Sequence, residues 1–74
     1  MGMDYSRLQG RIAEKMGTQA RFAREMALSE RTISLKLNGK RPFKQDEILR
    51  AARVLDIRRE EISPYFFTQD VQNR

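Results

Sequence analysis

Short runs of apolar residues at three- and four-residue spacing constrain the fold of this chain more than any other feature. Tyr5, Leu8, Ile12 and Met16 would share one face of a helix, with charged residues between them. Gly17 ends that run, and later runs are also short. Because no stretch alternates with period two for more than a few residues, we expect an all-α fold, a compact bundle of five short helices.

The residues that cap and end helices set the expected boundaries. The first helix ends at Gly17, and Thr18 caps a second helix of about nine residues. Ser29 caps the third, which Asn38-Gly39 ends. A fourth is expected over residues 45–55 with Ile48, Leu49, Ala52 and Leu55 inward. A fifth begins near Arg58 or Arg59 and is expected to end at Pro64 and the pair Phe66-Phe67. Phe43, between the third and fourth helices, is expected in the core.

The length of 74 residues fits one domain, for which we expect the span 4–67. Residues 1–3 are interpreted as a cloning extension and start, and residues 68–74 as a flexible tail. The chain has no cysteine and no histidine. We therefore expect no catalytic residues, no metal site, no cofactor and no small-molecule ligand, so an enzyme is not expected. No apolar run is long enough for a membrane span, and we expect a cytoplasmic protein.

The positive charge is concentrated in one window. From Arg31 to Lys44 there are five cations and no acid, while the rest of the chain is neutral overall. A focused basic patch is typical of a site for a polyanion, since each neutralised phosphate releases condensed counterions. A solvated loop that happens to be basic is the alternative interpretation. The same window contains the expected third helix, which is rich in small polar and charged side chains. Two short helices joined by a short turn describe a helix-turn-helix, formed here by the second and third helices.

The segment Thr18-Gln-Ala-Arg-Phe-Ala-Arg-Glu-Met-Ala-Leu-Ser-Glu-Arg-Thr-Ile-Ser-Leu-Lys-Leu-Asn-Gly-Lys40 resembles the lambda-repressor-like helix-turn-helix of phage repressors and Cro proteins. The resemblance runs from about Leu8 to Ile62. It implies a phage transcriptional regulator, a Cro-like repressor, with residues 29–38 as the recognition helix in the major groove of operator DNA. It also implies action at the nucleoid of a bacterial host. Two positions depart from the family pattern. Ala27 replaces the usual turn glycine, and Lys36 stands where the family tends to bury a residue.

Residues near the start of a recognition helix reach base edges, so four side chains are predicted to contact bases. They are Glu30, Arg31, Ser34 and Leu35. Glu30 has the alternative role of a first-turn acid, and Leu35 that of a partly buried or isolated surface leucine. A second set is predicted to contact the DNA backbone. It comprises Gln19, Ser29, Thr32, Lys36, Asn38, Lys40, Arg41 and Lys44.

Three aromatic residues close the expected last helix, more than it can bury alone. We expect Tyr65, Phe66 and Phe67 to form part of a homodimer contact that sets two recognition helices about 34 Å apart on DNA. A different class of function stays open at this point. A small helical protein-interaction module, for host-factor binding or an antitoxin-like role, would use the same basic face.

Overall fold

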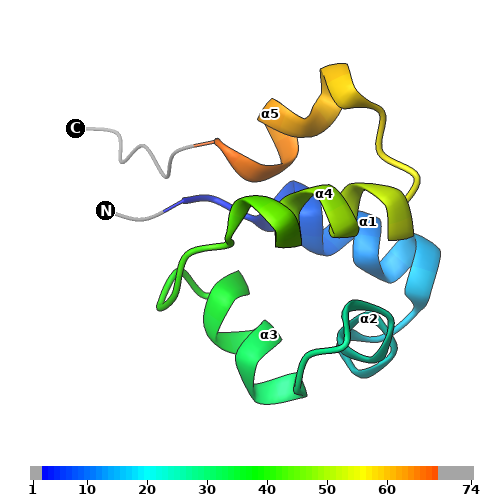
Figure 1. Cartoon of the computed structure of the whole chain (residues 1–74), viewed down its shortest axis with the longest axis vertical. Helices are drawn as coiled ribbons and strands as arrows, with labels where there is room; N and C mark the ends of the chain where they lie inside the picture. Colours follow the sequence, from blue (N-terminus) through cyan, green and yellow to red (C-terminus); the bar gives the residue numbers. More distant parts are fainter. Residues whose placement is uncertain (1–2, 69–74) are drawn as a thin grey trace.

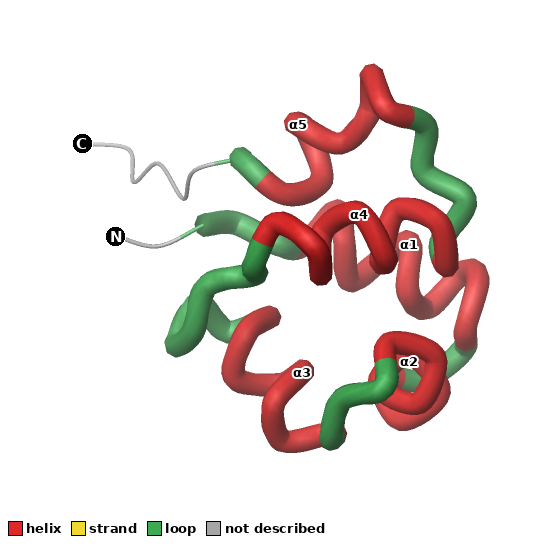
Figure 2. The backbone as a smooth tube through the Cα atoms, in the orientation of Figure 1, coloured by secondary structure: helices red, strands yellow, loops and turns green. Residues whose placement is uncertain are grey.

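The structure, a computed structural model, describes residues 3–68. Its helices are α1 (Ser6–Met16), α2 (Gln19–Met26), α3 (Glu30–Leu37), α4 (Gln45–Val54) and α5 (Ile62–Phe66), with a 3₁₀ turn at Arg59–Glu61 leading into α5. Figure 1 shows α4 across the middle, with α5 on one side of it and α2 and α3 on the other. The described part contains helices joined by loops and turns, with no strand (Figure 2). The predicted all-α fold of five short helices is therefore confirmed.

Local sequence explains where the helices begin and end. The Thr18 hydroxyl accepts a hydrogen bond from the Arg21 N–H at 3.1 Å and so caps α2, as predicted. Gly17 has φ +86°, a left-handed conformation that a glycine adopts without steric cost, and it ends α1. The Arg11 guanidinium donates to the Leu55 carbonyl at 3.0 Å and to the Asp56 carbonyl at 3.0 Å, which joins α1 to the end of α4.

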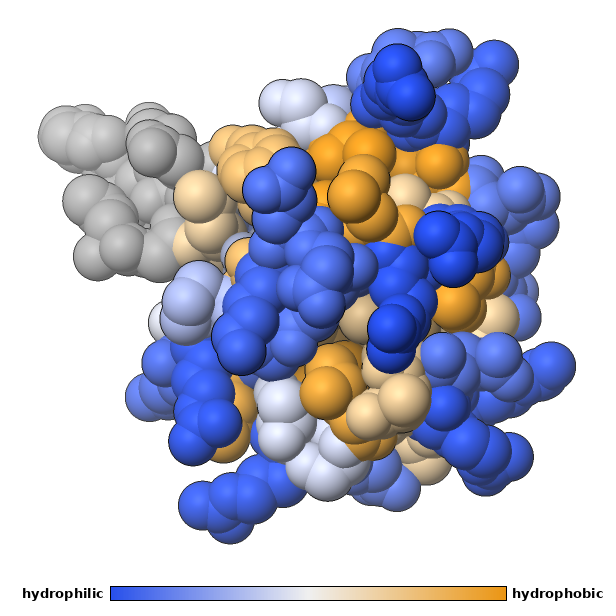
Figure 3. All heavy atoms as spheres, in the orientation of Figure 1, coloured by the Kyte–Doolittle hydropathy of each residue, from blue (hydrophilic) through white to orange (hydrophobic). Residues whose placement is uncertain are grey.

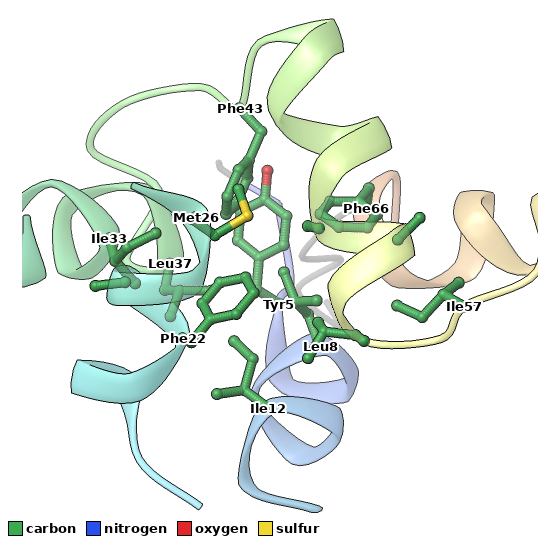
Figure 4. Packing of buried hydrophobic residues seen from close by; sticks show 14 residues of the cluster. Tyr5, Leu8, Ile12, Phe22, Met26, Ile33, Leu37, Phe43, Ile57 and Phe66 are labelled. Carbon is green, nitrogen blue, oxygen red and sulfur yellow. The ribbon is translucent and has the colours of Figure 1, made fainter. Parts of the chain in front are cut away.

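The core is a single apolar cluster to which every helix contributes (Figure 4). Phe43 is buried in it, as the sequence predicted. The Phe43 ring stands edge-on to the rings of Tyr5 and Phe66, with centroid distances of 5.3 and 5.5 Å. Phe43 therefore anchors the connection between α3 and α4 to the start of α1 and to α5.

The inward face of α4 differs from the prediction. Leu49 was expected to face the core but is 51% exposed, whereas Ala51 is fully buried. Ala51, Ala52 and Leu55 follow the spacing of one helix face, and small side chains there let α4 approach its neighbours closely. Leu49 lies outside that face, and its side chain is left in solvent.

The end of α5 also differs from the prediction. Pro64 was expected to end the helix, but it lies inside α5. It is the third residue of the helix, where the missing N–H has no intrahelical partner to lose. Thr68, placed in the predicted tail, accepts a hydrogen bond on its carbonyl from the Asp4 N–H at 2.7 Å. The rest of that tail, and the first two residues of the predicted extension, lie outside the described residues. Among the described helices, none is long and apolar enough to cross a membrane.

Candidate nucleic-acid interface

The α2–α3 unit is joined by a turn that a non-glycine residue makes. The Leu28 N–H donates to the Ala23 carbonyl at 2.9 Å and the Ala27 N–H to the Arg24 carbonyl at 3.1 Å, the two bonds of a Schellman helix end. Ala27 has φ 60° and ψ 37°, so it occupies the left-handed region. The sequence left open whether this turn avoids a positive φ or accepts strain. The structure adopts the strained turn, at a cost of about 1–2 kcal/mol.

The start of α3 is capped by its own side chains. The Ser29 hydroxyl accepts from the Thr32 N–H at 3.0 Å and donates to the Thr32 hydroxyl at 2.9 Å. Ser29 is exposed and Thr32 is half-buried. Both were predicted to contact the DNA backbone, and both serve first as the cap of α3. The cap fixes the direction in which the first turn of α3 presents Glu30 and Arg31, whose side chains are exposed.

The later predicted contacts on α3 are less accessible. Ser34 and Leu35 are half-buried, and the Asn38 side-chain amide donates to the Ser34 hydroxyl at 3.3 Å. Asn38 itself is exposed at the end of the helix. Gln19, at the start of α2, is exposed as well. The outward face of α3 therefore presents Glu30 and Arg31 fully, and Ser34 and Leu35 in part.

The prediction that Lys36 contacts the DNA backbone is wrong. Lys36 is only 4% exposed, and its ammonium lies 2.9 Å from a Glu47 carboxylate oxygen. The same ammonium donates to the Pro42 carbonyl at 2.9 Å and lies 5.8 Å from the centre of the Phe43 ring. Lys36 lies on the buried side of α3, three residues after Ile33, and Leu37 is buried beside it. The charge is satisfied internally and cannot reach DNA.

Glu47 has a structural role beyond that of an acid in the first turn of α4. Its carboxylate accepts from the Lys44 N–H at 2.8 Å, in addition to the ion pair with Lys36. Burial raises the pKa of Glu47, but the hydrogen bonds from Lys36 and Lys44 and their positive charges outweigh it, so the net pKa is lowered. The spacing from Lys44 to Glu47 is that of a helix-capping acid, a signal that could have identified the residue.

The loop that follows α3, residues 38–44, is held on the protein and presents its cations outward. Lys36 holds the Pro42 carbonyl, Glu47 holds the Lys44 N–H, and the Lys40 N–H donates to the Leu35 carbonyl at 2.8 Å. Lys40, Arg41 and Lys44 are exposed, as is Arg31 on α3. None of these four cations forms an ion pair within residues 3–68. We call these four side chains the basic patch.

The predicted dimer contact is wrong in its central residue. Phe66 is 1% exposed and belongs to the core, where it packs against Phe43. Tyr65 is half-buried, and the Arg7 guanidinium lies 5.9 Å above its ring. Phe67 is 51% exposed. Consecutive residues of a helix point about 100° apart, so burying Phe66 turns Phe67 outward. Phe67 alone keeps the exposure that a dimer contact needs, and the homodimer stays a prediction.

Comparison with known proteins places the chain in a family. The family model described as "Protein of unknown function (DUF739)" matches residues 1–69. No curated protein matches the chain. Among solved structures, it is similar to the solution structure of the modulator of repression (MOR) of the temperate bacteriophage TP901-1 from Lactococcus lactis. The two chains are 54% identical, the match covers 97% of each, and the TM-score is 0.81. The chain is thus a relative of a phage regulatory protein, and it belongs to the DUF739 family.

Proposed function

We propose that this protein is a phage regulator that binds double-stranded DNA through α3 and the basic patch, with α2 and α3 acting as a helix-turn-helix. It is a binding protein without catalysis or cofactor in this proposal, and it acts at the nucleoid of a bacterial host. The observation that carries the proposal is the placement of Arg31, Lys40, Arg41 and Lys44. They are exposed, lie on α3 and the loop directly after it, and have no acidic partner among the described residues.

The positions of these residues suggest which would contact bases and which would contact phosphates. Arg31 and Glu30 lie in the first turn of α3, so they are the side chains that would meet base edges in the major groove, where an arginine can bind a guanine bidentately. Ser34 and Leu35 would contribute shorter-range contacts from one turn further on. Lys40, Arg41 and Lys44 would contact phosphates together with Gln19 and Asn38, and these contacts would position α3 without specifying sequence.

Selection of bound sequences from a randomised duplex library tests this proposal. We expect a recovered motif, and an affinity for it that falls with salt with a slope of about −3 for each bound copy, since each cation on a phosphate contributes about −0.9. A motif with two related half-sites about one helical turn apart would indicate that the protein binds DNA as a dimer, as predicted. A motif with a single half-site would indicate that one copy binds each site. Absence of binding by the folded protein at low salt would overturn the DNA proposal.

The printed name of the related phage protein favours a second candidate. A modulator of repression changes how repression works, and one route to that effect is contact with another protein. In this alternative the chain is a helical protein-interaction module that uses the basic patch for an acidic surface of its partner. The same library experiment separates the two candidates, because binding that is confined to a protein partner leaves the duplex library without enrichment.

A further inference from the structure

A hollow lies between α4 and α5, and no residue of α3 lines it. It has a volume of about 460 Å³ and is lined almost entirely by apolar side chains. They are Phe43, Ile48, Leu49, Ile62 and Phe67, with Gln45 at the edge. Figure 3 shows hydrophobic surface gathered over these two helices and hydrophilic residues around it.

A second hollow, of about 310 Å³, continues the first. The two share Phe43, Ile48 and Phe67, and the second also reaches Met3 and Arg41. Together they form one groove that runs from Ile62 to the loop after α3. We call it the α4–α5 groove.

The fold does not require the apolar side chains that edge this groove. Leu49 lies outside the buried face of α4, and Phe67 follows the end of α5, while their neighbours Ala51 and Phe66 fill the core. Both Leu49 and Phe67 are 51% exposed. A polar residue at either position would leave the core unchanged. Large apolar side chains gathered at one exposed hollow are typical of an interaction site.

The charges around the groove favour an acidic occupant. Arg41 lines one end, and Arg53 lies one helical turn after Leu49 near the other. Lys44 adjoins Gln45, and Asp46 is an exposed acid beside it. The other acids nearby already have cationic partners, since Glu47 pairs with Lys36, and Glu60 and Glu61 pair with Arg58. Neither Arg41 nor Arg53 forms an ion pair within residues 3–68. Acidic side chains that flank an apolar segment would therefore find unpaired cations at both ends of the groove.

The same charges disfavour a second copy of this chain as the occupant. In a two-fold arrangement the groove of one copy would lie against that of the other, running in the opposite direction. The Arg41 end of each groove would then face the Arg53 end of its neighbour. Like charges brought together in this way oppose association.

We propose that the α4–α5 groove binds an amphipathic helix of a partner protein that carries acidic residues beside its apolar stripe. Apolar side chains spaced three and four residues apart would enter the two hollows, between Leu49 and Phe67. A helix is the fitting element because α4 and α5 flank the larger hollow, and the described residues contain no strand that an extended segment could join. The groove shares Arg41 with the basic patch but contains none of the side chains predicted to contact bases, so peptide binding can be measured without DNA.

Selection from a library of helical peptides with randomised surface positions tests the proposal. We expect enriched peptides to share an apolar stripe with flanking Asp or Glu, and to shift the NMR signals of Leu49, Ile62 and Phe67. The variants Leu49→Ser and Phe67→Ser should each weaken binding about tenfold, and Arg53→Glu by a similar factor. Arg24→Glu, the same charge change as Arg53→Glu at an exposed arginine on α2, is the matched control and should leave peptide affinity unchanged.

The proposal is overturned if the enriched peptides lack acidic residues, if they bind equally well to Phe67→Ser, or if no peptide is enriched. Concentration-dependent dimerisation through Leu49 and Phe67 without peptide would assign the groove to a second copy. Circular dichroism of each variant establishes that it is folded before binding is measured. A chain that binds such peptides but no DNA would refute the proposed function alone, and the reverse result would refute only this inference.

Discussion

The Lys36 ammonium and the Glu47 carboxylate lie 2.9 Å apart, with side-chain exposures of 5% and 14%. The pair joins α3 to the first turn of α4, and each partner also holds one residue of the loop between them, at Pro42 and Lys44. The loop that carries Lys40 and Arg41 is thus fixed by a bond network that these two side chains form. A lysine with this many internal partners supports the shape of the basic patch without contributing its own charge to it.

Removal of one partner of this pair is expected to destabilise the fold strongly. Lys36→Ala leaves the Glu47 carboxylate poorly solvated and without its cation, a change that costs about 3–5 kcal/mol. The double variant Lys36→Met, Glu47→Leu should be more stable than Lys36→Ala because it leaves no unpaired charge. Denaturant unfolding measures both. Arg58→Ala, which removes exposed ion pairs with Glu60 and Glu61, is the control and should cost less than about 1 kcal/mol.

Stability should fall in acid, in part through Glu47. Its pKa is lower in the folded protein than in an unfolded chain, so its contribution is present above the ordinary carboxyl pKa and is lost as the pH falls through the folded value. Glu47→Gln should therefore lower the free energy of unfolding at neutral pH, and the difference from the unmodified protein should shrink on titration to about pH 2. Parallel curves over that range would show that Glu47 ionisation does not stabilise the fold. Asp4 and Glu61, whose pKa values are also lowered by hydrogen bonds from Ser6 and Arg58, add to the same trend in both proteins.

Relief of the strained turn between α2 and α3 should stabilise the protein. Glycine adopts the φ of 60° at Ala27 without a steric clash, although it also has more freedom in the unfolded chain. We expect Ala27→Gly to raise the free energy of unfolding by about 0.5–1 kcal/mol, measured by denaturant unfolding. Asp56, which also has φ 60°, is a matched comparison. Aspartate tolerates this region better than alanine, and Asp56→Gly should therefore gain less.

Alanine substitutions of Phe66 and Phe67, at the end of α5, should differ sharply in how much stability they cost. Phe66→Ala opens a cavity in the core and should cost about 3–5 kcal/mol. Phe67→Ala removes a side chain that is 51% exposed and should cost less than about 1 kcal/mol. Thermal unfolding of both variants measures the contrast. Equal losses would mean that Phe67 packs more tightly than its exposure indicates.

The DNA proposal predicts different consequences for Arg31 and Lys40. Arg31→Ala should reduce affinity for the selected motif by about 1–3 kcal/mol while leaving random DNA less affected. Lys40→Ala should weaken both alike and lower the salt slope by about 0.9. Fluorescence titration of motif and random duplexes at several salt concentrations measures these effects. Equal proportional losses for the two variants on both duplexes would contradict the assigned roles.

Local sequence signals predicted most of the fold. Caps at Thr18 and Ser29, the helix end at Gly17 and the burial of Phe43 depend on short-range chemistry, and the structure has them where the sequence indicated. Errors arose where the rotation of a helix about its own axis decides which of its apolar residues are buried. Leu49 and Phe66 belong to runs in which several apolar residues compete for one buried face, and only the packing of the neighbouring helices selects among them.

In the candidate site, too, the sequence predicted some residues correctly and others wrongly. The exposed cations of the basic patch are where a count of charges along the chain placed them. Lys36 is the exception, because its burial depends on a carboxylate eleven residues away in sequence, on a different helix. A charge count treats every lysine alike, whereas the fold distinguishes a lysine with a buried acceptor from one without.

The hydrogen bond from the Asp4 N–H to the Thr68 carbonyl closes the described chain nearly end to end. The two ends of the described part therefore lie side by side, and this part of the fold is topologically close to a ring. A circularly permuted chain could join these ends and open elsewhere. Removal of Asp4 would release the Thr68 carbonyl from its hydrogen bond, so truncation at one end of the described part loosens the other.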